Sequence, residues 1–331
     1  MSMLTPELLR DLVAEARLAP SVHNIQPTRW RGLPDGRLAL VDDRSVRAPA
    51  ADPSGHDVRV SHGAALEGMC LALNRRGLSA ADIAIGEEPL SPQHAVLCAL
   101  TVRAGAACDR LRDSVPRRMS WRGTFTDSPE DEASLRQLAA VRDDAVVIRD
   151  RDAIAGIAAW ADAAEYSFIR SADHRRELVQ WMRLSPSHPL YGENGLNREA
   201  LAMNAFEATG ARFVLGPLFP ALDWLGLAPS LLSERAKTSS AAAIVLFTRP
   251  LGEDPLVTGR HFYRVWLKID RAGLAACPIS ALADHAAFNG KLRELGRIAA
   301  DKRLVNVFKI GRPSTRQGVR HFRLPVDQLI V

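Results

Sequence analysis

The sequence predicts a protein of mixed helices and strands that is built from two domains or from two copies of one unit. The chain has 331 residues, more than most single domains, which favours two domains or two copies of one unit. Helical and strand patterns occur in both halves of the chain. One predicted helix has Gly63 near its start and Gly77 near its end. A second predicted helix has Gly259 and Gly273 in the same places, and the interval is 14 residues in both. A predicted strand and a loop precede each of these helices, as expected for a repeat.

The predicted elements of the first half begin with a helix. Thr5 is a good N-cap, a proline and an acid follow it, and apolar residues recur at helical spacing up to Ala16. Three more elements are predicted in this half: a strand over Arg37–Asp42, a helix over Arg59–Leu78 and an apolar, buried strand over Ala95–Val102.

The second half begins after residue 112 with a basic turn, Pro116–Phe125. We therefore expect one unit over residues 1–112 and a second over residues 113–331. Residues 184–234 are rich in proline and glycine and show no clear period, which predicts a lid-like insertion. The remaining predicted elements are helices over Asp131–Val141, Asp152–Met182, Val257–Leu274 and Ala286–Ile298, and strands over Ala145–Ile148, Ala241–Phe247 and Leu304–Ile310.

The composition is that of a globular protein with a sizeable core, since 47% of the residues are hydrophobic and 24% charged. The net charge is +5, but the basic residues are scattered among acidic ones, so we expect no nucleic-acid partner. The most apolar stretch, residues 213–232, contains three prolines and Asp223, which argues against a membrane span. The N-terminus lacks the pattern of a signal peptide, so we expect a cytoplasmic protein.

Several common chemistries find no support in the sequence. The four cysteines form no CxxC pair, and the histidines are not spaced with carboxylates as metal ligands are, so no metal site is expected. The chain has no GxGxxG after a strand and no GxxxxGK[ST], GxSxG or HExxH motif. The conventional dinucleotide, kinase, hydrolase and zinc-enzyme sites are therefore not indicated.

A polar loop follows the first helix, over Leu18–Pro27. Ser21, His23, Asn24 and Gln26 stand in it between two prolines. Short polar side chains held in this way suit a loop that binds a ligand through hydrogen bonds. The alternative is a polar turn that caps the preceding helix.

Two further stretches carry basic residues suited to an anion. Arg118, Ser120 and Arg122 place two guanidinium groups and a hydroxyl in one short segment, and such donors match phosphate oxygens. The alternative is a solvated basic turn. Arg312, directly after the last strand and close to Lys309, is a second anion candidate, and the alternative there is a charged exit loop.

A third candidate is the segment Gly273–Leu282, in which a turn containing Pro278 follows the end of a helix. The backbone N–H groups of such a turn can face a planar ligand. The alternative is ordinary connecting chain.

Together these motifs resemble those of the FMN-dependent nitroreductase family. Ala19–Pro27 is similar to its A-P-S-x-x-N-x-Q-P loop, and Arg118–Arg122 to its R-x-S-x-R phosphate motif. Gly273–Ser280 resembles the segment that flanks the flavin ring, and Leu304–Pro313 the final strand with its Gly-x-Pro. Common family members begin with R-x-S-x-R and form dimers. Here the A-P-S loop comes first, and this order, with the length, resembles the Acg-like branch, in which two units are fused.

The resemblance implies a nitroreductase-like α+β fold, duplicated within one chain, with central mixed sheets flanked by helices. It also implies one complete FMN site, with the loop from the first half and the phosphate clamp from the second. The degenerate second site should be empty or filled by side chains. The cofactor-binding residues implied by the resemblance are Pro20, Ser21, Asn24 and Gln26, then Arg118, Ser120 and Arg122 for the phosphate, Pro278, Ile279 and Ser280 at the ring, and Arg312 as a weaker phosphate candidate.

The implied activity is that of an NAD(P)H nitroreductase. Hydride would pass from NADPH or NADH through FMN to a small nitroaromatic or quinone-like acceptor, and no catalytic side chain is expected because the flavin carries the chemistry. The alternatives are a flavin-sequestering protein whose insertion closes over the site, with little turnover, and a specialised flavin oxidase or dehydrogenase. The expected assembly is a monomer that imitates a dimer, or a homodimer.

Overall fold

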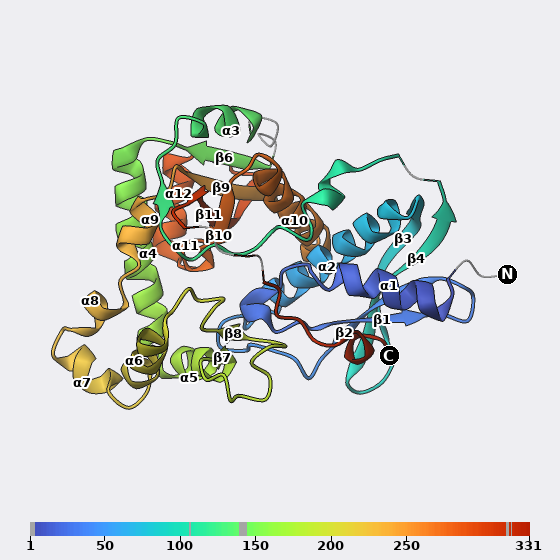
Figure 1. Cartoon of the computed structure of the whole chain (residues 1–331), viewed down its shortest axis with the longest axis horizontal. Coiled ribbons are helices and arrows are strands. Elements are labelled where there is room, and N and C mark those ends of the chain that lie inside the picture. The colour runs from blue at the N-terminus through green and yellow to red at the C-terminus, as the bar shows by residue number, and fades with distance from the viewer. Residues whose placement is uncertain (1–3, 106, 139–143, 316–317, 319) are drawn as a thin grey trace.

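Figure 1 shows the computed structural model of the chain, which describes residues 4–105, 107–138, 144–315, 318 and 320–331. Two β-sheets lie in different parts of the molecule, and two long helices, α2 (His56–Arg75) and α10 (Pro255–Arg271), lie between them (Figure 1).

The first sheet has four antiparallel strands in the order β1-β2-β4-β3. The strands are β1 (Thr28–Gly32), β2 (Leu38–Asp43), β3 (Leu78–Pro89) and β4 (His94–Ala104). Helices α1 (Pro6–Ala16) and α2 pack on this sheet and share one buried core with it, which includes Leu12, Met69 and Leu100. The predicted N-cap is confirmed, because the hydroxyl oxygen of Thr5 accepts a hydrogen bond from the Leu8 N–H at 3.2 Å.

The second sheet has the order β10-β11-β9-β6, again antiparallel, and β5 pairs with the end of β11. Its core on the α10 side contains Phe247, Phe262 and Phe308, and the rings of the last two stack with centroids 5.2 Å apart. The strands are β5 (Phe125–Thr126), β6 (Ala145–Ile148), β9 (Ala243–Pro250), β10 (Ala275–Pro278) and β11 (Lys302–Pro313), and the helices of this part, besides α10, are α3 (Asp131–Gln137), α4 (Arg151–Arg170), α11 (Ser280–Asp284) and α12 (Ala286–Leu295).

The two sheets repeat one arrangement. When β1, β2, β3 and β4 are matched with β6, β9, β10 and β11, the order across the sheet is the same in both. The long helix stands between the second and third matched strands in both, as α2 and α10. The predicted duplicated α+β fold is therefore confirmed, while the unit boundary at residue 112 stays a prediction.

The two central helices touch backbone to backbone at a pair of glycines. A Cβ atom added to Gly63 would lie 2.0 Å from the Leu256 carbonyl oxygen, and one added to Gly259 would lie 2.0 Å from the Val60 carbonyl oxygen. Each added atom would also lie 2.8 Å from the Cα of the other glycine. The equal contacts in both directions indicate an approximate two-fold axis between the glycines that the sequence repeat singles out.

The insertion contains short helices rather than an irregular lid. Its apolar residues lie on exposed as well as buried faces, with Phe206 and Trp224 exposed, so the sequence shows no helical period. Within the described ranges, no helix is both long and apolar enough to cross a bilayer. The elements from α4 to β9 are α5 (Ala172–Trp181), β7 (Met182–Arg183), β8 (Leu196–Asn197), α6 (Ala205–Leu215), α7 (Phe219–Trp224), α8 (Ala228–Leu232) and α9 (Arg235–Ser239).

The C-terminal tail returns from the second half to the first. Ile330 forms a parallel bridge with Trp30 of β1, so the antiparallel first sheet gains a parallel partner at its edge. Leu324 and Leu329 of the tail are buried in the core of the first sheet. Ser120 makes a similar parallel bridge to β10 in the second sheet.

The structure differs from the predicted elements in a few places, each for a physical reason. The sequence pattern misses β1 because its Arg29 is buried in an ion pair with Asp43, at 2.9 Å, instead of facing water. It misses β3 because that strand is largely exposed, and its few apolar residues that touch the core are only partly buried. The predicted helix over 152–182 is two helices that meet at Ser171, and the turn predicted around Pro278 includes the strand β10. The end of the predicted helix over 131–141 lies outside the described residues.

Candidate functional site

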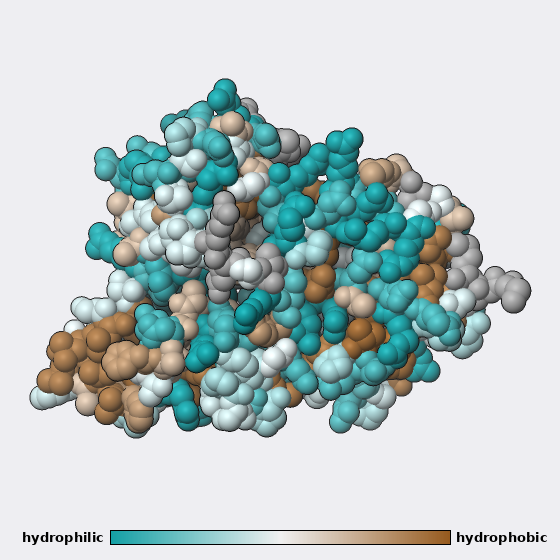
Figure 2. Space-filling view, in the orientation of Figure 1, coloured by the Kyte–Doolittle hydropathy of each residue, from teal (hydrophilic) through white to brown (hydrophobic). Residues whose placement is uncertain are grey.

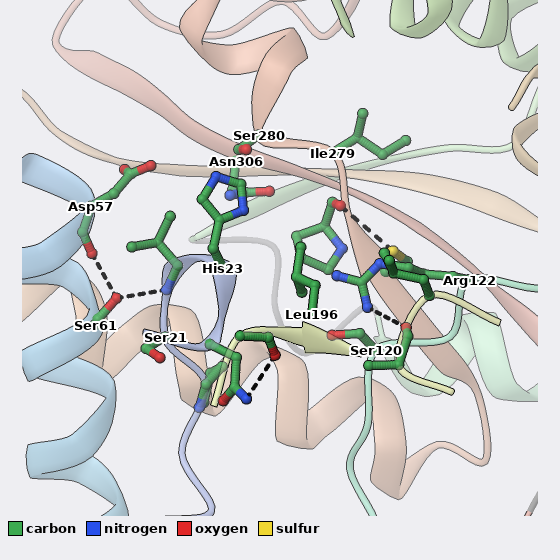
Figure 3. Close-up of a pocket in the computed structure, with 18 of the residues that line it drawn as sticks. Ser21, His23, Asp57, Ser61, Ser120, Arg122, Leu196, Ile279, Ser280 and Asn306 are labelled. Carbon is green, nitrogen blue, oxygen red and sulfur yellow. Dashed lines mark hydrogen bonds between the residues drawn. The ribbon is translucent and has the colours of Figure 1, made fainter. Parts of the chain in front are cut away.

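A cavity of about 510 Å³ lies where the two units meet. The loop after α1, the start of α2, the segment 118–122, strand β10 with the turn after it, and the insertion all contribute to its walls (Figure 3). Nine of the eleven residues implied by the resemblance line it: Pro20, Ser21, Asn24, Arg118, Ser120, Arg122, Pro278, Ile279 and Ser280. Ser21 and the pair Ser120 and Arg122 stand on opposite sides of it (Figure 3).

The polar loop has an unusual backbone. His23, Asn24 and Gln26 have φ angles of 43°, 56° and 56°, in the left-handed region that residues other than glycine rarely adopt. Such strain persists only where the surroundings enforce it, and it is common at functional sites. Two hydrogen bonds help to enforce it here: Gln26 N–H donates to Ser21 Oγ and Val22 N–H donates to Ser61 Oγ, both at 3.0 Å.

Asn24 connects the loop to the insertion and to the tail. Its amide nitrogen donates to the carbonyl oxygens of Gly195 and Phe322, both at 3.1 Å. Its amide oxygen accepts from Arg323 Nη1 at 2.9 Å. The side chain thus holds three segments together at the edge of the cavity.

Gln26 does not line the cavity. Its amide nitrogen donates to the Glu193 carbonyl oxygen at 2.8 Å, and its amide oxygen accepts from the Leu324 N–H at 2.9 Å. The side chain is buried behind the loop. Its role in this structure is to brace the loop from behind rather than to face a ligand.

Arg118 is buried in the wall of the cavity. Its guanidinium carbon lies 4.4 Å from the centre of a Trp266 ring, and Nη2 donates to the Leu18 carbonyl oxygen at 3.0 Å. Burial lowers the pKa of Arg118. Its Nε is buried and has no hydrogen-bond partner among the described residues. A buried cationic N–H without an acceptor is a donor available to an anionic ligand.

Arg122 and Lys309 add two cations to the cavity. Arg122 Nη1 donates to the Ala200 carbonyl oxygen at 2.8 Å. Lys309 is buried, and its ammonium nitrogen lies 3.9 Å from Glu234 Oε2. Together with Ser120, these residues form a donor set that suits a phosphate group.

Arg312 lies away from the cavity. Side chains alternate along a strand, so Lys309 and Arg312, three residues apart on β11, point to opposite faces. Arg312 pairs with Asp131 at 2.9 Å and with Glu130 at 3.1 Å. The structure therefore places Lys309 in the candidate phosphate cluster and Arg312 outside it.

The sequence motifs do not single out His23 as a site residue, although it stands within the polar loop. The side chain lines the cavity together with Asn306 and Ser280 (Figure 3). Its ring makes no hydrogen bond to any of the described residues. Burial, and secondarily the charge of Arg122, lowers the pKa of His23, so the imidazole is neutral near pH 7.

Two carboxyl groups of the cavity wall also belong to none of the sequence motifs. Burial, with the nearby charge of Glu234, raises the pKa of Glu165 to about 7. Burial, with the nearby Asp284 and Asp52, raises the pKa of Asp57 to about 7. Both groups therefore exchange protons near neutral pH.

Arg323 is a further residue that the motifs miss, because it stands in the tail, far from any of them. Its guanidinium donates to the carbonyl oxygens of Arg17, Leu18 and Ala19, at 2.6, 3.1 and 3.3 Å, and to Asn24. Burial, and secondarily the charge of Arg118, lowers the pKa of Arg323 to about 9. Arg323 thereby connects the C-terminal tail to the carbonyl groups that follow α1 and to the polar loop.

The helix α10 carries an ion-pair network at a position that the internal repeat matches with the cavity-lining part of α2. Gly63 and Gly259 are 196 residues apart, and the same offset pairs Ala64 with Arg260. Ala64 lines the cavity. Arg260 and Arg264 contact the buried carboxylate of Glu67 at 2.9 and 2.6 Å. That the second site is empty or filled by side chains stays a prediction.

The residues of the cavity fit FMN. The phosphate of FMN needs several donors, and Arg118 Nε, Arg122, Ser120 and Lys309 offer them. Its planar ring needs an apolar slot. The apolar residues of the wall that offer such surface are Leu196, Phe262, Trp266 and Ile279.

Known proteins similar to this chain are nitroreductase-like, although no family model matches it. The Mycobacterium tuberculosis protein named "Putative NAD(P)H nitroreductase acg" is 26% identical over 317 residues, which cover 92% of this chain and 90% of that protein. Another M. tuberculosis protein described as a "Putative NAD(P)H nitroreductase" is 27% identical over 188 residues, 53% of this chain, and the match spans about half (51%) of that protein.

A solved structure shows the same fold. The crystal structure of a "putative nitroreductase" from Anabaena variabilis has a TM-score of 0.50 at 10% identity, and the match covers 93% of this chain and 88% of that one. The chain thus has a nitroreductase-like fold, and its sequence resembles the Acg-like branch along nearly its whole length.

Proposed function

We propose that this chain, a duplicated nitroreductase-like protein similar to the Acg-like branch, is an FMN-dependent oxidoreductase. It uses NADPH or NADH and reduces a nitroaromatic or quinone-like acceptor. One observation carries the proposal: three motifs from distant parts of the sequence line one cavity with a phosphate-type donor set. The names of the similar nitroreductases support it.

Bound FMN would supply the redox chemistry, by accepting hydride from the nicotinamide and passing it to the acceptor. In this proposal Arg118, Ser120, Arg122 and Lys309 hold the phosphate. The residues that contact the rest of the cofactor are Pro20, Ser21, Asn24, Pro278, Ile279 and Ser280.

The cavity side chains also supply proton sites for an acceptor that takes up protons on reduction. His23 is neutral and has no hydrogen-bond partner within the described part of the chain, so it can donate to or accept from a bound acceptor. Glu165 and Asp57 have pKa values raised to about 7, so they hold and release protons near neutral pH.

A flavin-sequestering protein with little turnover is the second candidate, and the insertion favours it. Gly195 N–H donates to the Asn24 carbonyl oxygen at 3.1 Å, and the Ala200 carbonyl accepts from Arg122 at 2.8 Å. The insertion is therefore bonded to both the polar loop and the phosphate cluster. A wall held in this way restricts entry of a nicotinamide.

The two candidates differ in their response to nicotinamide. Purified protein should be yellow and release about one FMN per chain. For the oxidoreductase, NADPH or NADH should rapidly bleach the flavin absorbance in a stopped-flow experiment. A flavin that stays oxidised with both nicotinamides supports sequestration. A colourless protein that fails to take up added FMN would contradict both.

A double variant tests the phosphate cluster. Arg118→Ala with Arg122→Ala should abolish FMN retention, because it removes two of the cationic donors. The matched control is Arg136→Ala, whose side chain is 72% exposed on α3, and it should retain FMN fully. Unchanged FMN content in the double variant would show that the phosphate binds elsewhere.

A further inference from the structure

The insertion presents a large apolar surface. Phe206 is 87% exposed and Trp224 is 85% exposed. Figure 2 shows a continuous hydrophobic area over the corner that α6, α7 and α8 form in Figure 1. We call this surface the apolar corner, and its residues are Phe206, Phe213, Leu218, Trp224, Leu225, Leu227 and Leu231.

The apolar corner is almost free of charge. Residues 213–232 contain one charged side chain, Asp223. Tyr166 donates a hydrogen bond to Asp223, and Arg170 lies 3.3 Å from it, so its charge is already compensated. Glu207, on α6, is engaged in the capping box of that helix. Asp223 therefore keeps its partners when another molecule covers this surface. No charge of residues 213–232 is left buried and unpaired.

The size of the apolar corner is that of a protein interface. The seven side chains expose on the order of 800 Å² of mostly apolar surface, given that a large aromatic side chain carries about 150–250 Å². The largest patch on a typical monomer is about 300–600 Å². One side of a standard interface buries about 800 Å².

A membrane is a poorer fit than a protein. Segments that lie in a membrane interface combine an apolar face with several basic residues, which attract anionic lipid headgroups. Residues 205–232 contain one basic residue, Arg212, and two acidic ones, Glu207 and Asp223. The charge of this region therefore gives no attraction to an anionic bilayer.

We propose that a second copy of this chain covers the apolar corner, so that the protein forms a two-fold symmetric dimer through α6, α7 and α8. Two copies each carry a net charge of +5 and repel one another over most of their surfaces. A two-fold contact places a patch against itself, and an uncharged patch meets itself without repulsion. This interface is separate from the contact of α2 with α10, which is satisfied within one chain, and it does not depend on the proposed function.

The oligomeric state tests this inference. Sedimentation velocity and light scattering of the full chain, from low to high micromolar concentration, should give twice the 36.1 kDa of one chain. Phe206→Ser with Trp224→Ser should raise the dissociation constant of the dimer about 100-fold or more, because exposed aromatic anchors dominate such interfaces. The matched control is Leu251→Ser with Leu295→Ser, two exposed leucines outside the apolar corner, which should leave the dimer unchanged.

Circular dichroism and the melting temperature confirm that both double variants are folded. A wild-type monomer at every concentration would overturn the inference, and so would a Phe206→Ser, Trp224→Ser variant that dimerises as tightly as the wild type. Flotation of monomeric wild type with vesicles of phosphatidylcholine and phosphatidylglycerol would also overturn it and assign the corner to a membrane.

Discussion

At the scale of single residues, the cavity wall contains buried arginines that donate hydrogen bonds to backbone carbonyl oxygens. Within the described part of the chain Arg323 has no carboxylate partner, and it donates instead to carbonyl oxygens and to Asn24. Arg118 shares the Leu18 carbonyl oxygen with it and leaves one N–H unpaired. Burying cations in this way costs free energy, so their place in the cavity wall is consistent with a role in holding an anion.

Arg323→Gln is expected to loosen the polar loop. Three carbonyl oxygens lose a buried donor, so the free energy of unfolding should fall by about 2–4 kcal/mol in urea denaturation. FMN retention should fall with it, because the guanidinium also holds Asn24. The control Arg136→Gln, on an exposed surface, should change the stability by less than about 0.5 kcal/mol. Equal stability of the two variants would contradict this role of Arg323.

Asp57 should make the stability depend on pH. Its pKa is raised from 3.8 to about 7, so the folded state binds this proton more tightly than the unfolded chain does. The contribution to stability is therefore complete below pH 3.8 and is lost as the pH rises to about 7. Asp57→Asn should match the wild type near pH 4 and exceed it at pH 8 by about 1–2 kcal/mol, since Asp57 is only partly buried and solvent screening weakens the effect.

Urea denaturation at several pH values measures this difference. The control is Asp11→Asn, whose carboxylate is 70% exposed on α1 and whose effect should stay below about 0.5 kcal/mol at each pH. A difference between Asp57→Asn and the wild type that does not change with pH would contradict the assignment.

At the scale of elements, the contact between α2 and α10 positions the two units. Glycine is needed at both Gly63 and Gly259, because the backbones approach too closely for any side chain. Glycine inside a helix normally costs about 1 kcal/mol relative to alanine, so its presence twice at one contact has a packing reason. Phe262 and Trp266, which line the cavity, stand on α10 within two turns of this contact.

Gly63→Ala should therefore destabilise the protein although alanine favours helices. The added methyl would lie 2.0 Å from the Leu256 carbonyl oxygen, so the helices must move apart. We expect a loss of about 3 kcal/mol or more in urea denaturation. The control is Gly156→Ala in α4, where nothing lies within 4 Å of the added atom, and it should stabilise by about 0.5–1 kcal/mol. Stabilisation by Gly63→Ala would contradict the close contact.

At the scale of the whole molecule, the two halves complete one another. The tail of the second half supplies Leu324 and Leu329 to the core of the first sheet. In the opposite direction, the polar loop of the first half forms a wall of the cavity beside the second sheet. We therefore expect the chain to unfold as one cooperative unit.

Leu329→Ala tests this expectation. Its side chain is 3% exposed in the core of the first sheet, so its loss should lower the free energy of unfolding by about 2–4 kcal/mol. Tryptophan fluorescence and circular dichroism should report the same lowered midpoint in one transition. The control Leu295→Ala is 42% exposed and should shift the midpoint little. Two separated transitions would contradict cooperative unfolding.

Much of this molecule follows from local sequence. The α+β class, the helix begun by Thr5 and the central apolar strand are expressed by neighbouring residues, because helical and strand periods are local properties. The motifs that resemble the nitroreductase family are local too, and nine of the eleven residues that they imply line one cavity once the two halves pack together. The repeat of Gly63 and Gly259 indicates the duplication before any fold is known.

Only the tertiary structure decides the rest. It places Lys309 in the wall of the cavity and Arg312 outside it, since opposite faces of β11 meet different neighbours. It turns Gln26 to the back of the loop, and it brings Arg323 to the polar loop from 299 positions away in the sequence. Burial and charged neighbours move the pKa values of Asp57 and Glu165, and no local pattern encodes them. These features depend on contacts between segments distant in sequence, so they arise when the two halves pack together.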